Sequence, residues 1–473
     1  MADFVLVNPP LSPEARYGKL APVGNRLPNL GLAYLAAFLR AQGVDVAILD
    51  AAALGLDTTA AAARVAAQAP LVCGLTATTL GIRAAAELAA KIKQLSPDCV
   101  TVLGGPHVSS RPEETIESYR SIDYGVVGEG EATAWEIFRE VERGGSPALV
   151  KGVVYRDGGM VRFAKRRPLF AHLDDLPQPA WDLLPPLAPT YGPSPQSTFR
   201  LPSTILFTSR GCPYKCAFCD RGVFGQKLRM HGAAYVWEMM ELLYRQHSIV
   251  DFAFHDESLF IDEGRLVELC RAIQRSGLPL SFSCQARVDQ IISPFALREL
   301  AKAGCWQVSF GLESGSDDML RRLGKGTTVE QAREALRKVR AEGISTKAFI
   351  MLGAPGETAD TLRATRDFVL GEPLDDVMIG FFAPFPGAEL TNEIERHGRK
   401  IGGYQAMSEH QVSFVPTGLE ASELEKFRRR LYRSFYLRRA VFRHYRRRLR
   451  EPSSRRLLLR AAWQFLRHYA FSG

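Results

Sequence analysis

Short apolar segments alternate with helical stretches in two long parts of this chain of 473 residues. In the first part the expected strands are 4–8, 44–50, 71–76, 99–104 and 124–128, and the clearest helices are 30–42 and 82–95. Strands that alternate with helices form a parallel, doubly wound sheet, whose ligands bind at the carboxyl ends of the strands. We therefore expect an α/β domain over residues 1–145.

The second part, residues 203–395, repeats this alternation six times. Its expected strands begin near Ser203, Ile249, Leu278, Trp306, Ser345 and Asp376, and each except the last is followed by a helical stretch. Residues 146–202 read as a connector, with a hairpin over 152–163 and a proline-rich strap over 174–186. Residues 396–473 form a basic helical region, with expected helices over 423–450 and 455–469 on either side of Pro452.

A cluster of cysteines follows the first strand of the second part, in Arg210-Gly-Cys-Pro-Tyr-Lys-Cys-Ala-Phe-Cys-Asp220. Gly211 and Pro213 cannot continue the strand, so Cys212, Cys216 and Cys219 are expected on a loop. Three thiolates can hold a 4Fe–4S cluster whose fourth iron stays open for a small molecule. The alternative is a zinc knuckle, which needs a fourth ligand such as His231.

The other five cysteines lie singly in apolar segments and are expected to be buried small hydrophobic residues. They are Cys73, Cys99, Cys270, Cys284 and Cys305. No apolar run approaches the ~20 residues that cross a bilayer, and the first residues lack the pattern of a secretory signal. We therefore expect a cytoplasmic protein, in which thiols stay reduced.

The charge of the chain is unevenly distributed. Residues 426–473 contain sixteen Lys and Arg but one acid, Glu451, giving +15, so residues 1–425 carry −6 of the total of +9. Basic helices with aromatic side chains can lie on an anionic membrane surface, bind RNA, or pack on the barrel with a solvated basic face. All three interpretations stay open, with RNA the least favoured.

Glycine, hydroxyl and amide groups gather where the strands of the first domain end. Glycines let a backbone approach a ligand closely, and no Gly-x-Gly-x-x-Gly follows the first strand, which argues against a dinucleotide. The candidate binding residues at these ends are Asn8, Thr76, Thr78, Gly104, Gly105, His107, Gly128, Glu129 and Gly130.

The spacing Cys-x-x-x-Cys-x-x-Cys, with an aromatic residue before the last cysteine, resembles the signature of radical S-adenosylmethionine (SAM) enzymes. Leu-Thr-Ala-Thr-Thr79, Gly104-Gly-Pro-His107 and Gly128-Glu-Gly-Glu131 are similar to the cobalamin-binding domain that precedes many of them. The resemblance covers residues 1 to about 390. It implies a Rossmann-like (flavodoxin-like) cobalamin domain, a partial (β/α)6 barrel and a C-terminal helical extension. No Asp-x-His-x-x-Gly occurs, so His107 is expected near the corrin and not as a cobalt ligand.

By the same resemblance, the three cysteines ligate the cluster and the barrel-strand ends bind SAM. Asp256 and Glu257 would accept hydrogen bonds from the SAM ammonium, Arg287 would fork onto its carboxylate, and Glu313 would meet the ribose. Gly353 and Glu357 would line the adenine. Taken singly, each charged residue could instead be a solvated side chain or a structural ion pair.

The favoured function is a cobalamin-dependent radical SAM C-methyltransferase. The resemblance implies that a 5′-deoxyadenosyl radical removes a hydrogen from an unactivated carbon, methylcobalamin supplies the methyl group, and a second SAM restores it. A membrane-bound tail would favour a hydrophobic substrate: a lipid, an isoprenoid or hopanoid, or a tetrapyrrole. An electron donor such as flavodoxin or ferredoxin is expected.

Two alternatives remain. The first is an oxidative cyclase or rearranging enzyme, as in the anaerobic porphyrin-ring cyclase. The second is an RNA-modifying methylthiotransferase, which would need a second set of cluster cysteines that Cys73 and Cys99 alone do not supply.

Overall fold

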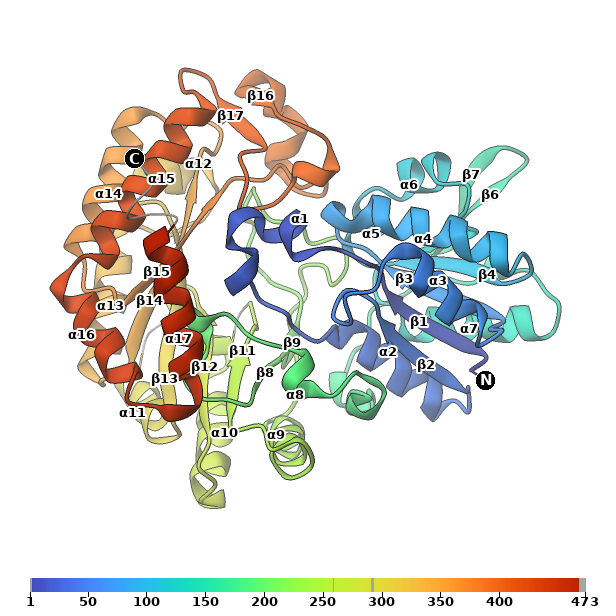
Figure 1. The fold of residues 1–473 in the computed structure, drawn as a ribbon, viewed down its shortest axis with the longest axis horizontal. Helices are drawn as coiled ribbons and strands as arrows, with labels where there is room; N and C mark the ends of the chain where they lie inside the picture. Colours follow the sequence, from blue (N-terminus) through green and yellow to red (C-terminus); the bar gives the residue numbers. More distant parts are fainter. Residues whose placement is uncertain (1, 258, 291–292, 468–473) are drawn as a thin grey trace.

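The computed structural model of the chain describes residues 2–257, 259–290 and 293–467. Ser258, which follows the expected SAM residues Asp256 and Glu257, and residues 468–469, at the end of the expected last helix, lie outside the described residues. Figure 1 shows two α/β units side by side, with the first two of the three C-terminal helices on the side of the second unit that is far from the first. Within the described ranges, no helix is both long enough and apolar enough to cross a membrane.

The first unit is a doubly wound sheet with the strand order β2-β1-β3-β4-β5-β6-β7. The five parallel strands have the expected flavodoxin-like order, and two separate apolar cores fill the two faces of the sheet. Its strands are β1 (Phe4–Asn8), β2 (Val46–Asp50), β3 (Val72–Thr76), β4 (Val100–Gly104), β5 (Tyr124–Val126), β6 (Val153–Asp157) and β7 (Met160–Phe163). Its helices are α1 (Pro13–Tyr17), α2 (Leu30–Ala41), α3 (Thr58–Ala66), α4 (Ile82–Leu95), α5 (Pro106–Ser110), α6 (Pro112–Ser118) and α7 (Glu131–Glu142).

The hairpin that the sequence places in the connector extends this first sheet. β6 pairs antiparallel with β5, and β7 with β6. An edge strand exposes unpaired N–H and C=O groups, so the hairpin satisfies those of β5.

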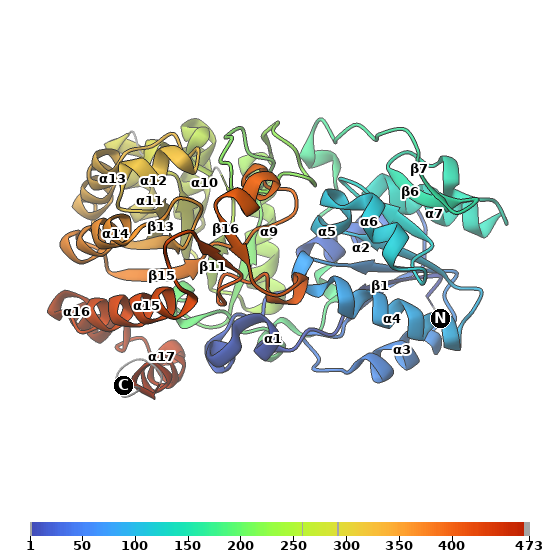
Figure 2. The same ribbon diagram turned by 90° about the horizontal axis from the view of Figure 1, so that it is seen from above.

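The second unit is an open parallel half-barrel with the strand order β15-β14-β13-β12-β11-β8, which confirms the expected partial barrel. Its strands are β8 (Ser203–Leu206), β11 (Asp251–Phe254), β12 (Ser281–Ala286), β13 (Cys305–Glu313), β14 (Ser345–Leu352) and β15 (Asp376–Phe381). Helices α9 (Ala233–His247), α10 (Glu263–Ser276), α11 (Pro294–Lys302), α12 (Asp317–Arg322), α13 (Val329–Ala341) and α14 (Ala359–Gly371) follow the strands and cover the outside (Figure 2).

The C-terminal region forms three helices, the first on the β15 side of the barrel and the last against residues 18–23 and 195–197. They are α15 (Ala421–Tyr436), α16 (Arg439–Arg448) and α17 (Pro452–Phe465). The hydroxyls of Tyr436 and Tyr445 donate to the two oxygens of the buried Asp376, over 2.6 and 2.8 Å. Arg448 is buried, and its guanidinium donates to the carbonyls of Pro195 and Thr198. The tail therefore packs on the rest of the chain through its inner face, as one of the three interpretations of the sequence expects.

The expected single helix over 423–450 was wrong, because the chain bends at Arg438, which has extended backbone angles. The bend directs the Arg438 guanidinium at the end of α14, where it donates to the carbonyls of Val369, Leu370, Glu372 and Leu374 at 2.6–3.2 Å. A cation at a helix C-terminus satisfies free carbonyls and complements the helix dipole. This distant partner outweighs the local preference for an unbroken helix.

Replacing Arg438 should therefore destabilise the fold. We expect Arg438→Met to lower the free energy of unfolding by about 2 kcal/mol, since hydrogen bonds to a charged group are lost. Urea denaturation measures the change, with the exposed neighbour Arg439→Met as the matched control. Equal stabilities of the two variants would contradict this role of the bend.

Candidate functional site

The three cysteines lie on a loop whose base is closed by a short ladder. β9 (Ser209–Arg210) pairs antiparallel with β10 (Arg229–Met230) on either side of the loop. Gly211 has φ +83°, and a Cβ there would overlap the carbonyl of Lys227, so only glycine fits between the ladder and Cys212. This geometry turns the chain sharply into the cysteine loop.

The thiols of Cys212 and Cys216 lie close enough to that of Cys219 to influence its pKa. Burial, with smaller contributions from Glu257, Cys216 and Cys212, raises the pKa of Cys219 to about 12. The side chains around Cys219 therefore do not stabilise its thiolate, whereas metal ions do so outright. In the described ranges, no three His, Cys, Asp or Glu converge on a single metal ion. A 4Fe–4S cube binds each thiolate through a different iron, so this donor set fits a cluster.

His231, the fourth ligand that a zinc knuckle would use, is engaged elsewhere. Its Nδ1 lies 2.9 Å from Asp174 and its Nε2 3.5 Å from the Tyr34 hydroxyl, and its ring stacks on Tyr235. Burial lowers its pKa to about 4. The zinc alternative therefore lacks the ligand that it needs.

Asp256 and Glu257 follow β11 but face different groups. Asp256 Oδ1 accepts hydrogen bonds from the Thr208 N–H and from the hydroxyls of Thr208 and Ser209 at 2.5–3.0 Å, which fixes the chain before the cysteine loop. Its Oδ2 is buried with no hydrogen-bond partner in the described structure, so one acceptor is left for a ligand. Glu257 bonds to the Cys212 thiol, and burial raises its pKa.

Arg287 lies directly against the cysteine loop. Its Nη1 is 3.5 Å from Cys216 Sγ, and its guanidinium carbon is 3.6 Å from the centre of the Tyr214 ring. Its fork is paired with Asp289 at 3.0 Å, and Nη2 also donates to the Lys325 carbonyl. These contacts place a positive charge beside one cluster thiolate.

The remaining expected SAM residues differ in what they face: Glu313 lines a cavity, whereas Gly353 and Glu357 bond to each other. Glu313 has φ +62°, bonds to Lys325 at 2.9 Å and lines a cavity inside the barrel. The Gly353 N–H donates to Glu357 at 3.2 Å, and a Cβ at Gly353 would press on Leu424 of α15. Burial raises the pKa of Glu357 to about 7. Gly353 and Glu357 therefore stabilise their own loop, and their contact with adenine stays a prediction.

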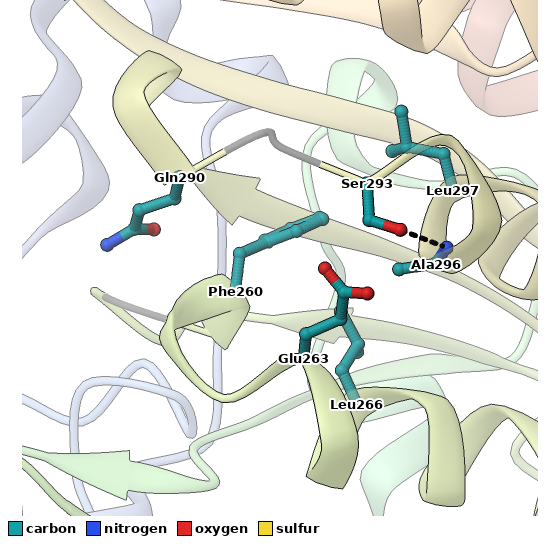
Figure 3. Close-up of a pocket in the computed structure, with 7 residues that line it drawn as sticks. All are labelled: Phe260, Glu263, Leu266, Gln290, Ser293, Ala296 and Leu297. Atoms are coloured by element: carbon teal, nitrogen blue, oxygen red, sulfur yellow. Dashed lines mark hydrogen bonds between the residues drawn. The ribbon is translucent and has the colours of Figure 1, made fainter.

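The cavity beside Glu313 has a volume of about 180 Å³ and lies at the carboxyl ends of β13, β14 and β15. Five phenylalanines and two methionines dominate its wall, which Phe218 joins to the cysteine loop. The lining residues are Phe218, Glu313, Phe349, Ile350, Met351, Met378, Gly380, Phe381, Phe382, Ala383, Phe385 and Glu409. A second cavity, between α10 and α11, has a volume of only about 10 Å³ (Figure 3). It has room for one water molecule and none for a cofactor.

The topology brings the expected cobalamin residues to one edge of the first sheet. Asn8, Thr76 and Gly104 end β1, β3 and β4; Thr78 and Gly105 follow two of these strands, and Gly128 and Gly130 follow β5. Asn8 donates to Asp50, which also accepts from Tyr191 of the connector. Gly105 has φ +100°, and a Cβ there would lie 2.8 Å from the Thr76 hydroxyl, so this turn requires glycine.

His107 is buried beneath the C-terminal segment. Its ring meets the edge of Tyr404 at 4.9 Å, its Nδ1 lies 3.3 Å from the Thr79 hydroxyl, and burial lowers its pKa to about 4. Its surroundings therefore keep it neutral and enclosed.

Glu129, expected to contact cobalamin, forms a buried ion network with two arginines that the sequence analysis missed. It accepts from Arg210 at 3.1 Å and from Arg229 at 2.8 Å, and Arg210 also donates to Glu131 at 2.6 Å. The only sequence signal is that the two arginines stand on either side of the cysteine loop, at the ladder residues. The network ties the cysteine loop to the edge of the first sheet.

Two family models match the chain: the B12 binding domain over residues 19–138 and the radical SAM superfamily over residues 206–369. An uncharacterized methyltransferase of Pyrococcus horikoshii is 30% identical over 422 residues, which cover 88% of this chain and 89% of the relative. The chain belongs to the cobalamin-binding radical SAM family. As a member it is an enzyme whose cofactors are a 4Fe–4S cluster, SAM and cobalamin.

Other members of this family, and their structures, also resemble the chain. The anaerobic magnesium-protoporphyrin IX monomethyl ester cyclase of Rubrivivax gelatinosus is 28% identical, covering 90% of this chain and 76% of the relative. The solved structure of the cobalamin-dependent SAM radical enzyme OxsB, with aqua-cobalamin and SAM bound, superposes with a TM-score of 0.68 at 22% identity. The match covers 83% of this chain and 55% of OxsB, so the chain spans about half of that protein's length.

The contact between Arg287 and Cys216 should tune the cluster. A positive charge beside a thiolate ligand favours the more negative, reduced cluster, so Arg287→Met should make the cluster harder to reduce. Arg287→Lys should be affected less because it keeps the charge. EPR-monitored potentiometric titration of the reconstituted protein measures the midpoint potential. An unchanged potential in Arg287→Met, with full iron content, would contradict this role.

Proposed function

We propose that this enzyme transfers a methyl group to an unactivated carbon of a hydrophobic substrate. The observation that carries the substrate class is the aromatic cavity at the carboxyl end of the barrel, next to the cysteine loop. The methyltransferase name of the Pyrococcus relative supports the reaction. When bound, SAM and the cluster supply an adenosyl radical, and cobalamin supplies a methyl group.

Apolar and polar residues of the cavity would bind and orient the substrate. Phe349, Met351 and Met378 offer an apolar wall that can bury a lipid, isoprenoid, hopanoid or tetrapyrrole group and keep water away. Phe218, the residue before Cys219, belongs to the same wall, so an apolar group in the cavity lies beside the cluster loop. Glu313, paired with Lys325, provides a polar site on the same wall.

Oxidative ring closure is the second candidate, because the Rubrivivax cyclase matches 90% of this chain. Both reactions begin with hydrogen removal and need the same cysteines. They differ in whether a methyl carbon enters the product. For either reaction, we propose that an electron-transfer protein such as flavodoxin or ferredoxin supplies the electron.

The fate of the SAM methyl group tests the proposal. We expect protein reconstituted with iron, sulfide and cobalamin to transfer the labelled methyl carbon of SAM into an organic-soluble product from a lipid and tetrapyrrole extract. Mass spectrometry follows this product together with 5′-deoxyadenosine, and Cys216→Ala should form neither. Formation of 5′-deoxyadenosine with an unlabelled, cyclised product would replace methyl transfer by the second candidate.

We also propose that the outer face of α16 and α17 binds an anionic lipid surface, which would bring the barrel to a hydrophobic substrate. Phe442, Leu459 and Trp463 on this face, and Leu437 just before α16, are 54–69% exposed among arginines. Exposed aromatic and basic side chains together are typical of helices that bind in the membrane interface. The inner faces of the two helices pack on the rest of the protein, so only their outer face is available to a lipid surface.

Point variants test this better than truncation. Truncation would also remove the tail residues that bond to Asp376 of β15 and to the carbonyls at the base of the barrel, so the barrel itself could be destabilised. We expect the wild type to float with vesicles containing phosphatidylglycerol, and less so at high salt because screening weakens the attraction. Phe442→Ser with Trp463→Ser should remain at the bottom of the gradient. Phe163→Ser, a 50% exposed phenylalanine of β7, is the matched control and should float. Failure of the wild-type protein to float with these vesicles would contradict the proposal.

A further inference from the structure

Both flanks of the cysteine loop are bonded to the first domain. Arg210 stands two residues before Cys212, and Asp220 directly follows Cys219. Their partners lie in the segments that follow β5 and β4, including the end of α5 and the start of α7, at the edge where the cobalamin residues are expected. The cysteine loop is thus held at its beginning and at its end by the domain that binds the other cofactor.

The first contact is a compact set of four charges. The side chains of Arg210, Arg229, Glu129 and Glu131 are only 2–9% exposed, and their charges balance. Glu129 also accepts the Phe170 N–H at 2.9 Å, so its oxygens meet several donors at once. Buried charge pairs of this kind are sensitive to geometry, since a displaced partner leaves a charge without compensation.

The second contact joins a serine hydroxyl of the first domain to the carboxylate of Asp220. The Ser110 hydroxyl, at the end of α5, donates to Asp220 Oδ2, and the Gly222 N–H donates to Oδ1 at 2.8 Å. A Cβ at Gly222 would lie 3.0 Å from the Ser110 hydroxyl oxygen, so the two backbones approach closely. The neighbouring Ser109 hydroxyl accepts the Gly128 N–H at 3.1 Å, which bonds the two anchoring loops of the first domain to each other.

We propose that Arg210 and Asp220 are positioning residues that fix the separation between the cluster and the corrin. This inference rests on the proposed function, in which one substrate carbon must meet groups delivered by both cofactors. Two contacts on opposite flanks of one short loop restrict both its position and its tilt. We expect cofactor binding itself to rely on other residues, the cysteines and the strand ends.

Magnetic coupling between the cofactors tests the proposal without turnover. The reduced cluster and cob(II)alamin are both paramagnetic, and the coupling between them weakens steeply with distance. We expect the wild type loaded with both cofactors to show a cob(II)alamin EPR signal broadened and relaxed by the cluster. Arg210→Lys and Ser110→Ala should each reduce this effect, and the double variant should lose it. Ser110→Ala removes one hydroxyl and no charge, so it keeps the test open if Arg210→Lys folds poorly.

The control is Arg40→Met, which breaks a pair between α2 and Asp182 of the connector that is about half exposed. Its coupling should equal that of the wild type. Coupling that is unchanged in Arg210→Lys and Ser110→Ala, with iron and cobalamin contents at wild-type levels, would overturn the inference alone. A wild type that binds the cluster but no cobalamin would overturn the proposed function first, and the inference with it.

Discussion

Four buried charges at the junction of the two units are the constraint on which the site depends. Arg210 and Arg229 come from the ladder that closes the cysteine loop, and Glu129 and Glu131 from the edge of the first sheet. Removing one partner from such a set leaves an uncompensated buried charge, at a cost of about 3–5 kcal/mol. That is a large fraction of the roughly 5–15 kcal/mol that stabilises a typical protein. The site is therefore assembled only when the two units are docked.

The layers of the fold could be predicted because they follow from local periodicity. Apolar segments such as Val72–Thr76 and helical stretches such as Ile82–Leu95 identify their own secondary structure, and their alternation implies parallel sheets. The bend at Arg438 could not be predicted in this way. Its cause is a set of carbonyls more than sixty residues earlier in the chain, and no local pattern carries that information.

The candidate site was likewise predictable where it depends on local sequence and unpredictable where it depends on distant residues. The spacing of the cysteines identifies a cluster loop, because the chemistry requires those residues close together in the chain. An acidic residue at a strand end is less informative, since Glu129 would look the same whether it faced a corrin or an arginine. Asp256 is intermediate: one oxygen braces the strand before the loop, and the other has no partner in the described structure. The aromatic cavity arises from side chains of three strands and of the segments after them, so it emerges only in three dimensions.

The position of the basic tail gives the molecule a large electric dipole moment. Residues 426–473 carry +15 and the remainder −6, and the tail helices α15 and α16 lie on the side of the barrel that is far from the first domain (Figure 1). A long-range field acts on such a charge distribution before any contact forms. Near an anionic surface the resulting torque turns the tail toward the surface and points the first domain into solution.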